Sequence, residues 1–389
     1  MLKERRISVL GASGSVGSQA LDIARARGYK VDFVSVNRDV SALEDIVREF
    51  SPKYAAVADE KAAKDAKIAL KDTNTQVLSA DSGIIEGIHL SQSDCVINAI
   101  IGEAGLMPTL ATVDAGKRLA LANKESLVIA GEIVMARAKR AGAEIIPVDS
   151  EHSAIFQSLM AGNEKEIKKI ILTASGGPFY SKTKEELKAV TLEDTLRHPT
   201  WKMGRKITVD SATLMNKGFE VIEAVHLFNT PPERVEVVVH RQSILHSAVE
   251  YIDNTVIGEL SVPDMRMCVQ YAVDYPTRYK SAGEELDLVK ISALTFEKPN
   301  YEAFPLLSLA KEAIGGGGAM PAILNASDEI AVAAFLNKEI SFTDISEVVL
   351  ETYSELLSSG IGAKTLEDII SCDRLARDVA RKVIKEKRN

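Results

Sequence analysis

The sequence has 389 residues, of which 46% are apolar and 26% are charged, and these fractions are typical of folded globular domains. The formal net charge of −8 argues against sequence-independent binding to nucleic acid or to an anionic membrane surface. The three cysteines form no CxxC pair, and no apolar run approaches the ~20 residues of a membrane span, so we expect a cytoplasmic protein without a cysteine-held zinc ion.

Residues 1–149 alternate short apolar runs with amphipathic stretches. RISVLGA, KVDFVSV, YAAVAD, CVINAI, RLALAN and AEIIPV predict strands, and SVGSQALDIARARG and VSALEDIVREF predict helices. This alternation is typical of an α/β fold with a Rossmann-like, doubly wound parallel sheet. We therefore predict a nucleotide-binding domain over residues 1–149. At the start of the chain we expect no signal peptide, because the sequence there lacks its apolar core.

The remaining chain changes character twice. EIKKIILTAS, RVEVVVH, SILHSAVEYID and TVIGELSV predict strands that face one another, which indicates a central α+β catalytic domain over residues 150–275. Residues 276–310 show little periodicity and contain prolines, so we expect a connector. AILNASDEIAVAAFLNKE, DISEVVLETYSELL and LEDIISCDRLARDVARKVIKEK predict an α-helical C-terminal domain over residues 311–389.

A glycine-rich turn, GASGSVG, separates the first predicted strand from the first helix. Its spacing is GxxGxxG, and the strand–turn–helix context favours dinucleotide binding at the helix N-terminus over an ordinary turn. The second strand ends in VSVNRDVS, where a basic residue favours NADP and an acidic residue favours NAD. Arg38 is basic and Asn37 can donate hydrogen bonds, so we predict NADP, although the acidic Asp39 complicates this prediction.

The segment LANKESLV places Asn123, Lys124 and Glu125 after another predicted strand. Open α/β sheets bind ligands at the carboxyl ends of their strands, so Lys124 is a candidate to contact a substrate oxygen or a phosphate. The alternative is an ordinary helix start with Asn123 as its N-cap, and the residues alone leave both open.

Two carboxylates, Asp149 and Glu151, follow the last strand of this domain in PVDSEHSAIFQ. In an extended segment they would point to the same side and repel each other unless a cation lay beside them. Carboxylate oxygens suit Mg²⁺ or Mn²⁺, so we predict a divalent metal site at the same sheet edge as Lys124. The alternative makes Asp149 the N-cap of a helix that starts at Ser150.

A third carboxylate comes from the predicted helix in DSATLMNKGFEVIEAVHLF, which puts Asn216, Lys217 and Glu220 on one face. A glycine inside a helix costs ~1 kcal/mol relative to alanine, so Gly218 indicates a packing or functional reason. The alternative is a solvated outer face on which Lys217 and Glu220 form an ordinary i,i+3 pair. If Glu220 joins the metal site, neutralising it should relieve charge repulsion in the metal-free protein.

Two further stretches precede this helix. In TASGGPF, Ser175 and two glycines follow a predicted strand and could form an anion-binding turn. RHPTWKMGRK, which contains His198, Trp201 and Gly204, is predicted to be a lid over a pocket. The alternative for this second stretch is a plain surface loop with one buried aromatic side chain.

Taken together, GASGSVGSQALDIAR, ANKESLV, PVDSEHSAIFQSL, TASGGPF, HPTWKMGRKITVDSATLMNKGFEVIEA and LNASDEIAVAAFL resemble the 1-deoxy-D-xylulose 5-phosphate reductoisomerase family over nearly the whole chain. The resemblance implies rearrangement of 1-deoxy-D-xylulose 5-phosphate and NADPH-dependent reduction to 2-C-methyl-D-erythritol 4-phosphate, an isoprenoid precursor. It also implies a divalent metal (Mg²⁺, Mn²⁺ or Co²⁺), a homodimer, and a small phosphorylated sugar as substrate, with no nucleic-acid or membrane partner.

The resemblance further implies residue roles by matching position. Asp149, Glu151 and Glu220 would bind the metal, and Lys124, Glu151 and His198 would be catalytic. The substrate would contact Lys124, Ser150, Glu151, Ser175, His198, Ser211, Asn216, Lys217 and Glu220. NADPH would contact Ser13, Gly14, Ser15, Val16, Asn37, Arg38, Asn123, Glu125 and Gly204. The chain departs from the family pattern after the second strand, where VSVNRDV lacks a glycine, and at Arg241, where proline is usual.

Two other functions remain open from the residues alone. A non-catalytic nucleotide sensor would keep the glycine-rich turn but would not need the three carboxylates. A metal-assisted, NADP-dependent hydroxy-acid dehydrogenase would use the carboxylates but would lack the rearrangement. Neither would form a product from 1-deoxy-D-xylulose 5-phosphate.

Overall fold

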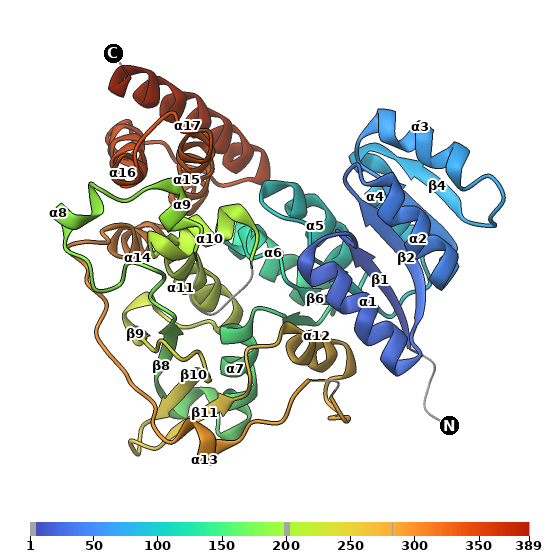
Figure 1. Cartoon of the computed structure of the whole chain (residues 1–389), viewed down its shortest axis with the longest axis horizontal. Coiled ribbons are helices and arrows are strands. Elements are labelled where there is room, and N and C mark those ends of the chain that lie inside the picture. Colours follow the sequence, from blue (N-terminus) through green and yellow to red (C-terminus); the bar gives the residue numbers. More distant parts are fainter. Residues whose placement is uncertain (1–4, 198–202, 282, 389) are drawn as a thin grey trace. The chain divides into compact units, whose positions relative to one another are not determined.

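A computed structural model describes residues 5–197, 203–281 and 283–388 of the chain (Figure 1). The chain divides into two compact units. Unit 1 comprises Met1–Ser126, Ile133–Ser153 and Asp264–Glu284, and unit 2 comprises Leu127–Glu132, Ala154–Pro263 and Glu285–Asn389. Neither unit is one continuous segment, and the four consecutive domains expected from the sequence stay a prediction.

Unit 1 is built on a seven-stranded sheet in the order β4-β3-β2-β1-β5-β6-β7. Each neighbouring pair of these strands is parallel. The strand order reverses between β1 and β5, so the sheet is doubly wound with its switch point there, as predicted. The strands are β1 (Arg6–Leu10), β2 (Lys30–Val36), β3 (Tyr54–Val57), β4 (Gln76–Ser79), β5 (Cys95–Asn98), β6 (Arg118–Leu121) and β7 (Ile145–Pro147).

Continuous apolar runs explain the core of unit 1. Every residue of β3 and β5 is buried, as a parallel sheet covered on both faces requires. Phe33 of β2 and Ile88 of the helix after β4 are fully buried in one apolar cluster. Strand β4 is absent from the sequence-based predictions because QVLS is short and buries only Leu78.

Helices connect the strands of unit 1, and a helix from much later in the chain, α12, packs on α1. There the Arg27 guanidinium lies 3.6 Å from the Asp274 carboxylate and 4.1 Å from the ring centre of Tyr279. The helices are α1 (Ser15–Arg27), α2 (Val40–Phe50), α3 (Glu60–Ala69), α4 (Ala80–Leu90), α5 (Leu106–Asp114), α6 (Glu125–Ala141), α7 (Ser150–Ser158) and α12 (Met265–Asp274). Parts of α6 and α7 belong to unit 2.

Unit 2 contains a four-stranded sheet in the order β11-β10-β8-β9. Strand β10 is antiparallel to β11 and to β8, and β8 is parallel to β9. The strands are β8 (Ile167–Ala174), β9 (Val235–Val239), β10 (Leu245–Tyr251) and β11 (Val256–Leu260). The central α+β region predicted from the sequence is therefore confirmed.

Helices make up the rest of unit 2, and the three C-terminal ones, α15, α16 and α17, pack on one another. They confirm the predicted helical region at the end of the chain. The helices are α8 (Lys184–Leu187), α9 (Leu192–Thr195), α10 (Arg205–Ala212), α11 (Met215–Phe228), α13 (Leu288–Ile291), α14 (Leu306–Gly316), α15 (Met320–Leu336), α16 (Phe342–Ser358) and α17 (Leu366–Lys387).

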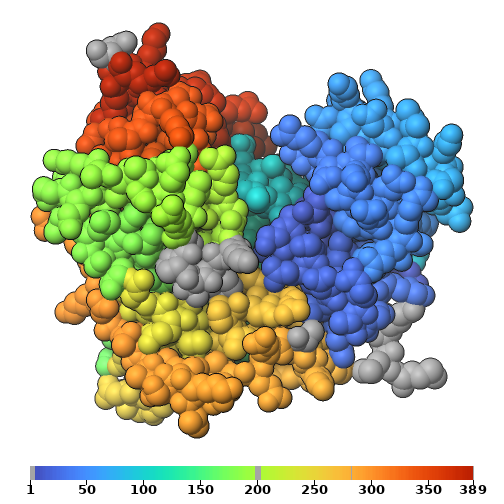
Figure 2. Space-filling view, in the orientation of Figure 1, coloured from blue at the N-terminus to red at the C-terminus, as the bar shows by residue number. Residues whose placement is uncertain are grey.

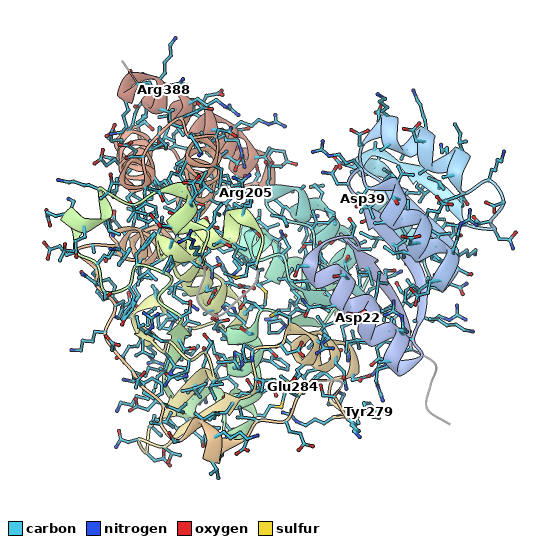
Figure 3. All side chains as sticks on the ribbon, viewed as in Figure 1. Asp22, Asp39, Arg205, Tyr279, Glu284 and Arg388 are labelled. Atoms are coloured by element: carbon cyan, nitrogen blue, oxygen red, sulfur yellow. The ribbon has the colours of Figure 1, made fainter. Side chains whose placement is uncertain are left out.

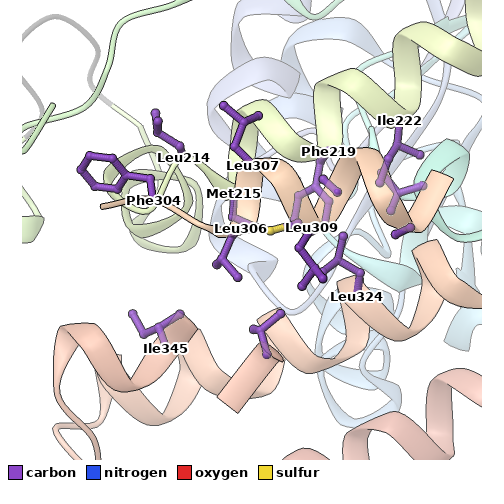
Figure 4. Close-up of a cluster of buried hydrophobic side chains, with 14 of the residues drawn as sticks. Leu214, Met215, Phe219, Ile222, Phe304, Leu306, Leu307, Leu309, Leu324 and Ile345 are labelled. Atoms are coloured by element: carbon purple, nitrogen blue, oxygen red, sulfur yellow. The ribbon is translucent and has the colours of Figure 1, made fainter. Parts of the chain in front are cut away.

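The contact between α11 and α14 explains the glycine inside α11. A Cβ atom at Gly218 would lie 2.8 Å from the Cβ atom of Ala310, closer than side chains approach each other. Around this point Met215 and Phe219 of α11 pack with Leu306 of α14 (Figure 4). Gly218 therefore has a packing reason, the close approach of α14.

The same apolar core extends to the surface segment that precedes α10. Leu187 of α8 and Leu192 of α9 share a buried cluster with Phe342 of α16, and Figure 2 shows this green segment directly against the orange and red C-terminal helices.

Within the described ranges, no helix is both long enough and apolar enough to cross a membrane.

Candidate functional site

The turn after β1 depends on three glycines. Gly11 has φ +72°, and a Cβ atom there would lie 2.7 Å from the Ala99 carbonyl oxygen, while one at Gly17 would lie 2.2 Å from the Gly11 carbonyl oxygen. The backbone N–H of Gly14 donates to the Gly11 carbonyl at 2.9 Å, and no side chain caps α1. The turn therefore presents the N-terminus of α1 beside the switch point of the sheet, where a pyrophosphate is commonly bound.

The residues after β2 separate into two roles. Asp39 is the N-cap of α2, because its carboxylate accepts the backbone N–H of Ala42 at 3.0 Å (Figure 3). The capping bond gives Asp39 a structural role, so the acidic residue here does not by itself indicate NAD. Asn37 and Arg38 are exposed next to it. Their contact with the cofactor phosphate stays a prediction.

Lys124 and Asp149 meet at the carboxyl edge of the unit 1 sheet. Strands β6 and β7 are neighbours, with Leu121 opposite Pro147, and each candidate side chain follows the end of its strand. Lys124 Nζ lies 2.7 Å from Asp149 Oδ2, and their side chains are only 9% and 13% exposed. The prediction that they share one edge is confirmed, and the cation beside Asp149 within unit 1 is the Lys124 ammonium.

Two opposing effects act on the pKa of Asp149. Burial raises it, but Lys124 and His152 outweigh burial and hold the pKa of Asp149 well below its usual range. The His152 ring is fully buried, with Nδ1 3.8 Å from Asp149 Oδ1. Asp149 is therefore a carboxylate at neutral pH, which is the state that a metal ligand requires.

Glu151 lies in the first turn of α7 and not in an extended segment. The extended geometry predicted for residues 149–151 is therefore wrong, because the helix starts immediately after Asp149. The Asp149 carbonyl accepts the Ser153 N–H at 2.8 Å, so Asp149 does precede the helix as the N-cap alternative requires. The Ser150 hydroxyl donates to Glu151 Oε2 at 2.5 Å. A position before a helix leaves Asp149 available for both capping and ligation.

Asn123 has the bonds of a helix-capping residue. It is 1% exposed, its Nδ2 donates to the carbonyls of Ile100 and Gly102 at 2.8 and 2.9 Å, and its Oδ1 accepts the Ser126 N–H at 3.0 Å. This supports the structural alternative for the Asn123 side chain. Nδ2 also lies 3.1 Å from Glu125 Oε2. Cofactor contacts of Asn123 and Glu125 stay predictions.

Unit 2 brings the turn after β8 against the end of α10. Gly176 and Gly177 both have positive φ, of +80° and +65°. A Cβ atom at Gly177 would lie 2.6 Å from the Ser211 carbonyl oxygen, so only glycine permits this approach. The Gly177 N–H donates to Ser175 Oγ at 3.4 Å. Ser175 and Ser211, predicted as substrate contacts, therefore belong to touching segments.

The next helix carries a buried charged cluster. Leu214, with φ +59°, links α10 to α11. Glu220 is 1% exposed and Lys217 is 4% exposed, and Glu220 accepts bonds from Lys217 Nζ at 2.5 Å and from Asn216 Nδ2 at 2.6 Å. The solvated outer face, which was the alternative interpretation of these residues, is contradicted.

The remaining residues singled out in the sequence are not part of these clusters or are not described. His198 and Trp201 lie outside the described residues. Gly204 is exposed and precedes α10. The Arg241 guanidinium stacks 3.7 Å from the ring centre of Tyr180, which gives this residue a packing role. Glu223, a second buried carboxylate of α11, is missing from the sequence-based predictions although it is only 1% exposed. It lies three residues after Glu220 in a largely apolar helix, and this spacing is the sequence signal that could have identified it.

Comparisons with known families cover almost the whole chain. The family model described as 1-deoxy-D-xylulose 5-phosphate reductoisomerase matches residues 7–131, and the model of its C-terminal domain matches residues 145–228. A second model, described as DXP reductoisomerase C-terminal domain, matches residues 260–379. The three matches follow one another along the chain.

Relatives with the same family name match this chain over almost their whole length. The 1-deoxy-D-xylulose 5-phosphate reductoisomerase of Acetivibrio thermocellus is 49% identical over 380 residues, with 98% of this chain and 99% of the relative covered. That of Chlorobium chlorochromatii is 48% identical over 379 residues, with 97% and 99% covered.

Among solved structures, the reductoisomerase from Zymomonas mobilis in complex with NADPH has a TM-score of 0.92 at 41% identity, with 98% of this chain and 99% of that chain covered. A reductoisomerase in complex with NADPH, fosmidomycin and magnesium has a TM-score of 0.92 at 38% identity, with 98% of each chain covered. The chain therefore belongs to the 1-deoxy-D-xylulose 5-phosphate reductoisomerase family.

Proposed function

We propose that this chain converts 1-deoxy-D-xylulose 5-phosphate into 2-C-methyl-D-erythritol 4-phosphate by a metal-assisted rearrangement and an NADPH-dependent reduction. The observation that carries the proposal is the buried Lys124–Asp149 pair at the carboxyl ends of β6 and β7, in a chain of this family. The glycine-rich turn after β1 lies on the same edge of the same sheet. One edge thus supplies groups for the cofactor and for the reacting carbons.

The substrate phosphate is proposed to bind on unit 2, to Ser175, Ser211, Asn216 and Lys217. Their hydroxyl, amide and ammonium groups all offer hydrogen-bond donors, and Lys217 adds a positive charge. The touching turns at Gly177 and Ser211 support this grouping. Because Glu220 accepts bonds from Asn216 and Lys217, a phosphate at these donors competes with that carboxylate.

A divalent ion, Mg²⁺, Mn²⁺ or Co²⁺, is proposed to bind Asp149 and Glu151 of unit 1 and Glu220 of unit 2. The donor set fits, because all three side chains are carboxylates, which hard cations prefer, and because Asp149 is ionised. When bound, the ion supplies Lewis acidity to the substrate carbonyl and hydroxyl oxygens.

NADPH is proposed to place its pyrophosphate at the N-terminus of α1, against Ser13–Val16, and its 2′-phosphate beside Arg38. No side chain caps this helix, so its first backbone N–H groups face the turn. When bound, the cofactor supplies the hydride for the reduction. Asn37, Asn123, Glu125 and Gly204 remain proposed contacts by matching position in the family.

The reacting centre is proposed to include Lys124, Glu151 and His198. The Lys124 ammonium is held 2.7 Å from the Asp149 carboxylate, so its position at this edge of the sheet is fixed. In a buried setting such a donor stabilises negative charge on a substrate oxygen more than it does in water. Ser150 and Glu151 follow Asp149 directly, at the start of α7.

The experiment is an assay of purified protein with 1-deoxy-D-xylulose 5-phosphate, NADPH and Mg²⁺. We expect loss of the reduced-nicotinamide absorbance, formation of 2-C-methyl-D-erythritol 4-phosphate by NMR, and loss of both on EDTA treatment. Lys124→Met should lower turnover by roughly a hundredfold, whereas Lys139→Met, at an exposed position of the same helix, should not. A nucleotide sensor or a hydroxy-acid dehydrogenase would consume no NADPH with this substrate.

A homodimer in the cytoplasm is also proposed. Strand β11 is an edge strand of the unit 2 sheet, and apolar side chains are exposed on and near it, with Ile252 64%, Val256 51% and Leu260 39% exposed. An exposed apolar edge of this kind supports self-association. Sedimentation equilibrium should give twice the chain mass, and a monomer at micromolar concentration would contradict the proposal.

A further inference from the structure

Three charged side chains that belong to neither the proposed metal ligands nor the proposed phosphate contacts meet where α10 packs on α15. Lys206 Nζ lies 2.7 Å from Asp210 Oδ2 and 3.1 Å from Asp328 Oδ2. Asp328 is fully buried, the Asp210 side chain is 4% exposed, and the Lys206 side chain is 22% exposed. All three belong to unit 2.

Lys206 is the charged group that joins the two acids of this cluster. Its ammonium lies within ion-pair distance of a carboxyl oxygen of each acid, and the two acids belong to different helices. Burial raises the pKa of Asp328, and the Lys206 charge opposes this shift. The Lys206–Asp328 pair therefore joins α10 to α15.

The cluster connects the segments that carry the proposed phosphate donors. Asp210 precedes Ser211 on α10. The Lys206 ammonium also lies 4.9 Å from the ring centre of Phe219 on α11, and Phe219 stands between Lys217 and Glu220. One ammonium therefore contacts α10, α11 and α15 together.

Helix α15 is itself anchored, which makes it a suitable support. Asn325 Nδ2 donates to Glu329 Oε1 at 3.3 Å, and Glu329 pairs with Arg377 of α17 at 2.8 Å. Arg377 in turn binds the buried Asp373 at 2.6 Å. By contrast, α10 has only 8 residues, which is too short to hold its own conformation without tertiary contacts.

We propose that Asp328 is a positioning residue of the reaction, which acts through Asp210 and Lys206 to fix α10 and α11 so that Ser211 and Lys217 receive the substrate phosphate. This rests on the proposed function. A buried charged cluster is often no more stabilising than apolar side chains of equal volume, but its ion pairs require the paired groups to lie at particular positions. The cluster therefore specifies one placement of α10 on α15, where apolar packing would accept several.

The test compares Asp328→Leu, Lys206→Met and Asp328→Asn with the wild type. Asparagine keeps the shape of Asp328 and an acceptor oxygen toward Lys206 but removes the charge of the pair. Lys338→Met is the control, because Lys338 follows the same helix α15 but forms an exposed pair with Glu193 at 2.9 Å. For each protein we would measure the substrate KM and kcat, the substrate Kd by calorimetry, the NADPH Kd and the melting temperature.

Asp328→Leu and Lys206→Met should raise the substrate KM and Kd by about tenfold or more, because small misplacement of binding groups costs one to two orders of magnitude. Their kcat should stay within about threefold of the wild type and their NADPH Kd within about twofold, since a group that holds the phosphate equally in both states affects mainly KM. Lys338→Met should match the wild type, and Asp328→Asn should lie between the wild type and Asp328→Leu, because its amide oxygen still accepts from Lys206.

Unchanged substrate KM and Kd in a folded Asp328→Leu or Lys206→Met protein would overturn the inference. So would equal losses of substrate and NADPH affinity, which would indicate general destabilisation. If Asp328→Leu does not fold, Lys206→Met decides. A wild type that neither binds nor turns over the substrate refutes the proposed function and the inference with it, whereas an active wild type with unaffected variants refutes the inference alone.

Discussion

Glu220→Gln tests whether the buried carboxylate of α11 stabilises the metal-free protein. Glu220 accepts bonds from Lys217 at 2.5 Å and from Asn216 at 2.6 Å inside the protein. Glutamine keeps one acceptor oxygen but removes the charge that faces Lys217. Removing one partner of a buried ion pair costs ~3–5 kcal/mol, and the retained acceptor reduces the expected loss to about 2 kcal/mol.

The assay is thermal unfolding of EDTA-treated protein. A loss of about 2 kcal/mol corresponds to a melting temperature about 4–8 °C lower for a folded unit of about 200 residues, the approximate size of unit 2. Glu355→Gln is the matched control, because Glu355 forms only an exposed pair, 3.8 Å from Lys382, and should leave the melting temperature unchanged.

Repulsion among three carboxylates, which is what the sequence suggests, predicts the opposite sign for Glu220→Gln. A metal-free variant that melts at or above the wild-type temperature would refute the ion-pair reasoning. A Mn²⁺ titration tests the ligand role separately, since the variant should bind Mn²⁺ more weakly. Equal Mn²⁺ affinity would leave Glu220 as a structural partner of Lys217 and remove it from the proposed metal site.

Three further substitutions test other parts of the chain. Arg38→Ala should weaken NADPH binding by roughly tenfold or more but leave NADH binding nearly unchanged, because one charge-assisted bond to the 2′-phosphate is lost; equal losses would contradict this. Burial lowers the pKa of His226 from 6.5 to about 4, so protonation favours the unfolded state and stability falls by up to about 3 kcal/mol as pH falls through that window. His226→Gln should flatten this part of a urea-unfolding series, and an unchanged pH dependence would refute the assignment. Gly177→Ala should raise the substrate KM, because its Cβ would lie 2.6 Å from the Ser211 carbonyl oxygen. Gly142→Ala is the control, because Gly142 also has a left-handed φ but has open space around it, so this variant should affect stability alone. Equal KM values for the two variants would show that the turn at Gly177 does not hold the phosphate.

The sequence predicts those parts of the site that depend on local structure or on the rules of parallel sheets. The glycine-rich turn follows from a strand, three glycines and a helix within a short stretch. The approach of Lys124 to Asp149 follows because parallel strands place their carboxyl ends on one edge. Neither inference requires knowledge of a distant segment.

The remaining features depend on packing that a local pattern does not contain. Lys217 and Glu220 are buried by tertiary packing around α11, and an amphipathic pattern alone favours a solvated face. Asp328 stands in an apolar stretch that predicts a core helix, and its partners on α10 come from a different region of the sequence. The extended geometry expected at Glu151 fails because α7 already starts at Ser150, directly after Asp149.

The packing of α12 on α1 has a consequence for synthesis. The seven strands of unit 1 are complete once Pro147 has left the ribosome, but Arg27 meets Asp274 and Tyr279 only after the whole of β8 to β11 has been translated. At ~5–20 residues per second this delay is on the order of 10 s. During that interval the nascent sheet exposes the surface of α1 that α12 later covers, so a chain stalled shortly after β7 should be a substrate for ribosome-associated chaperones.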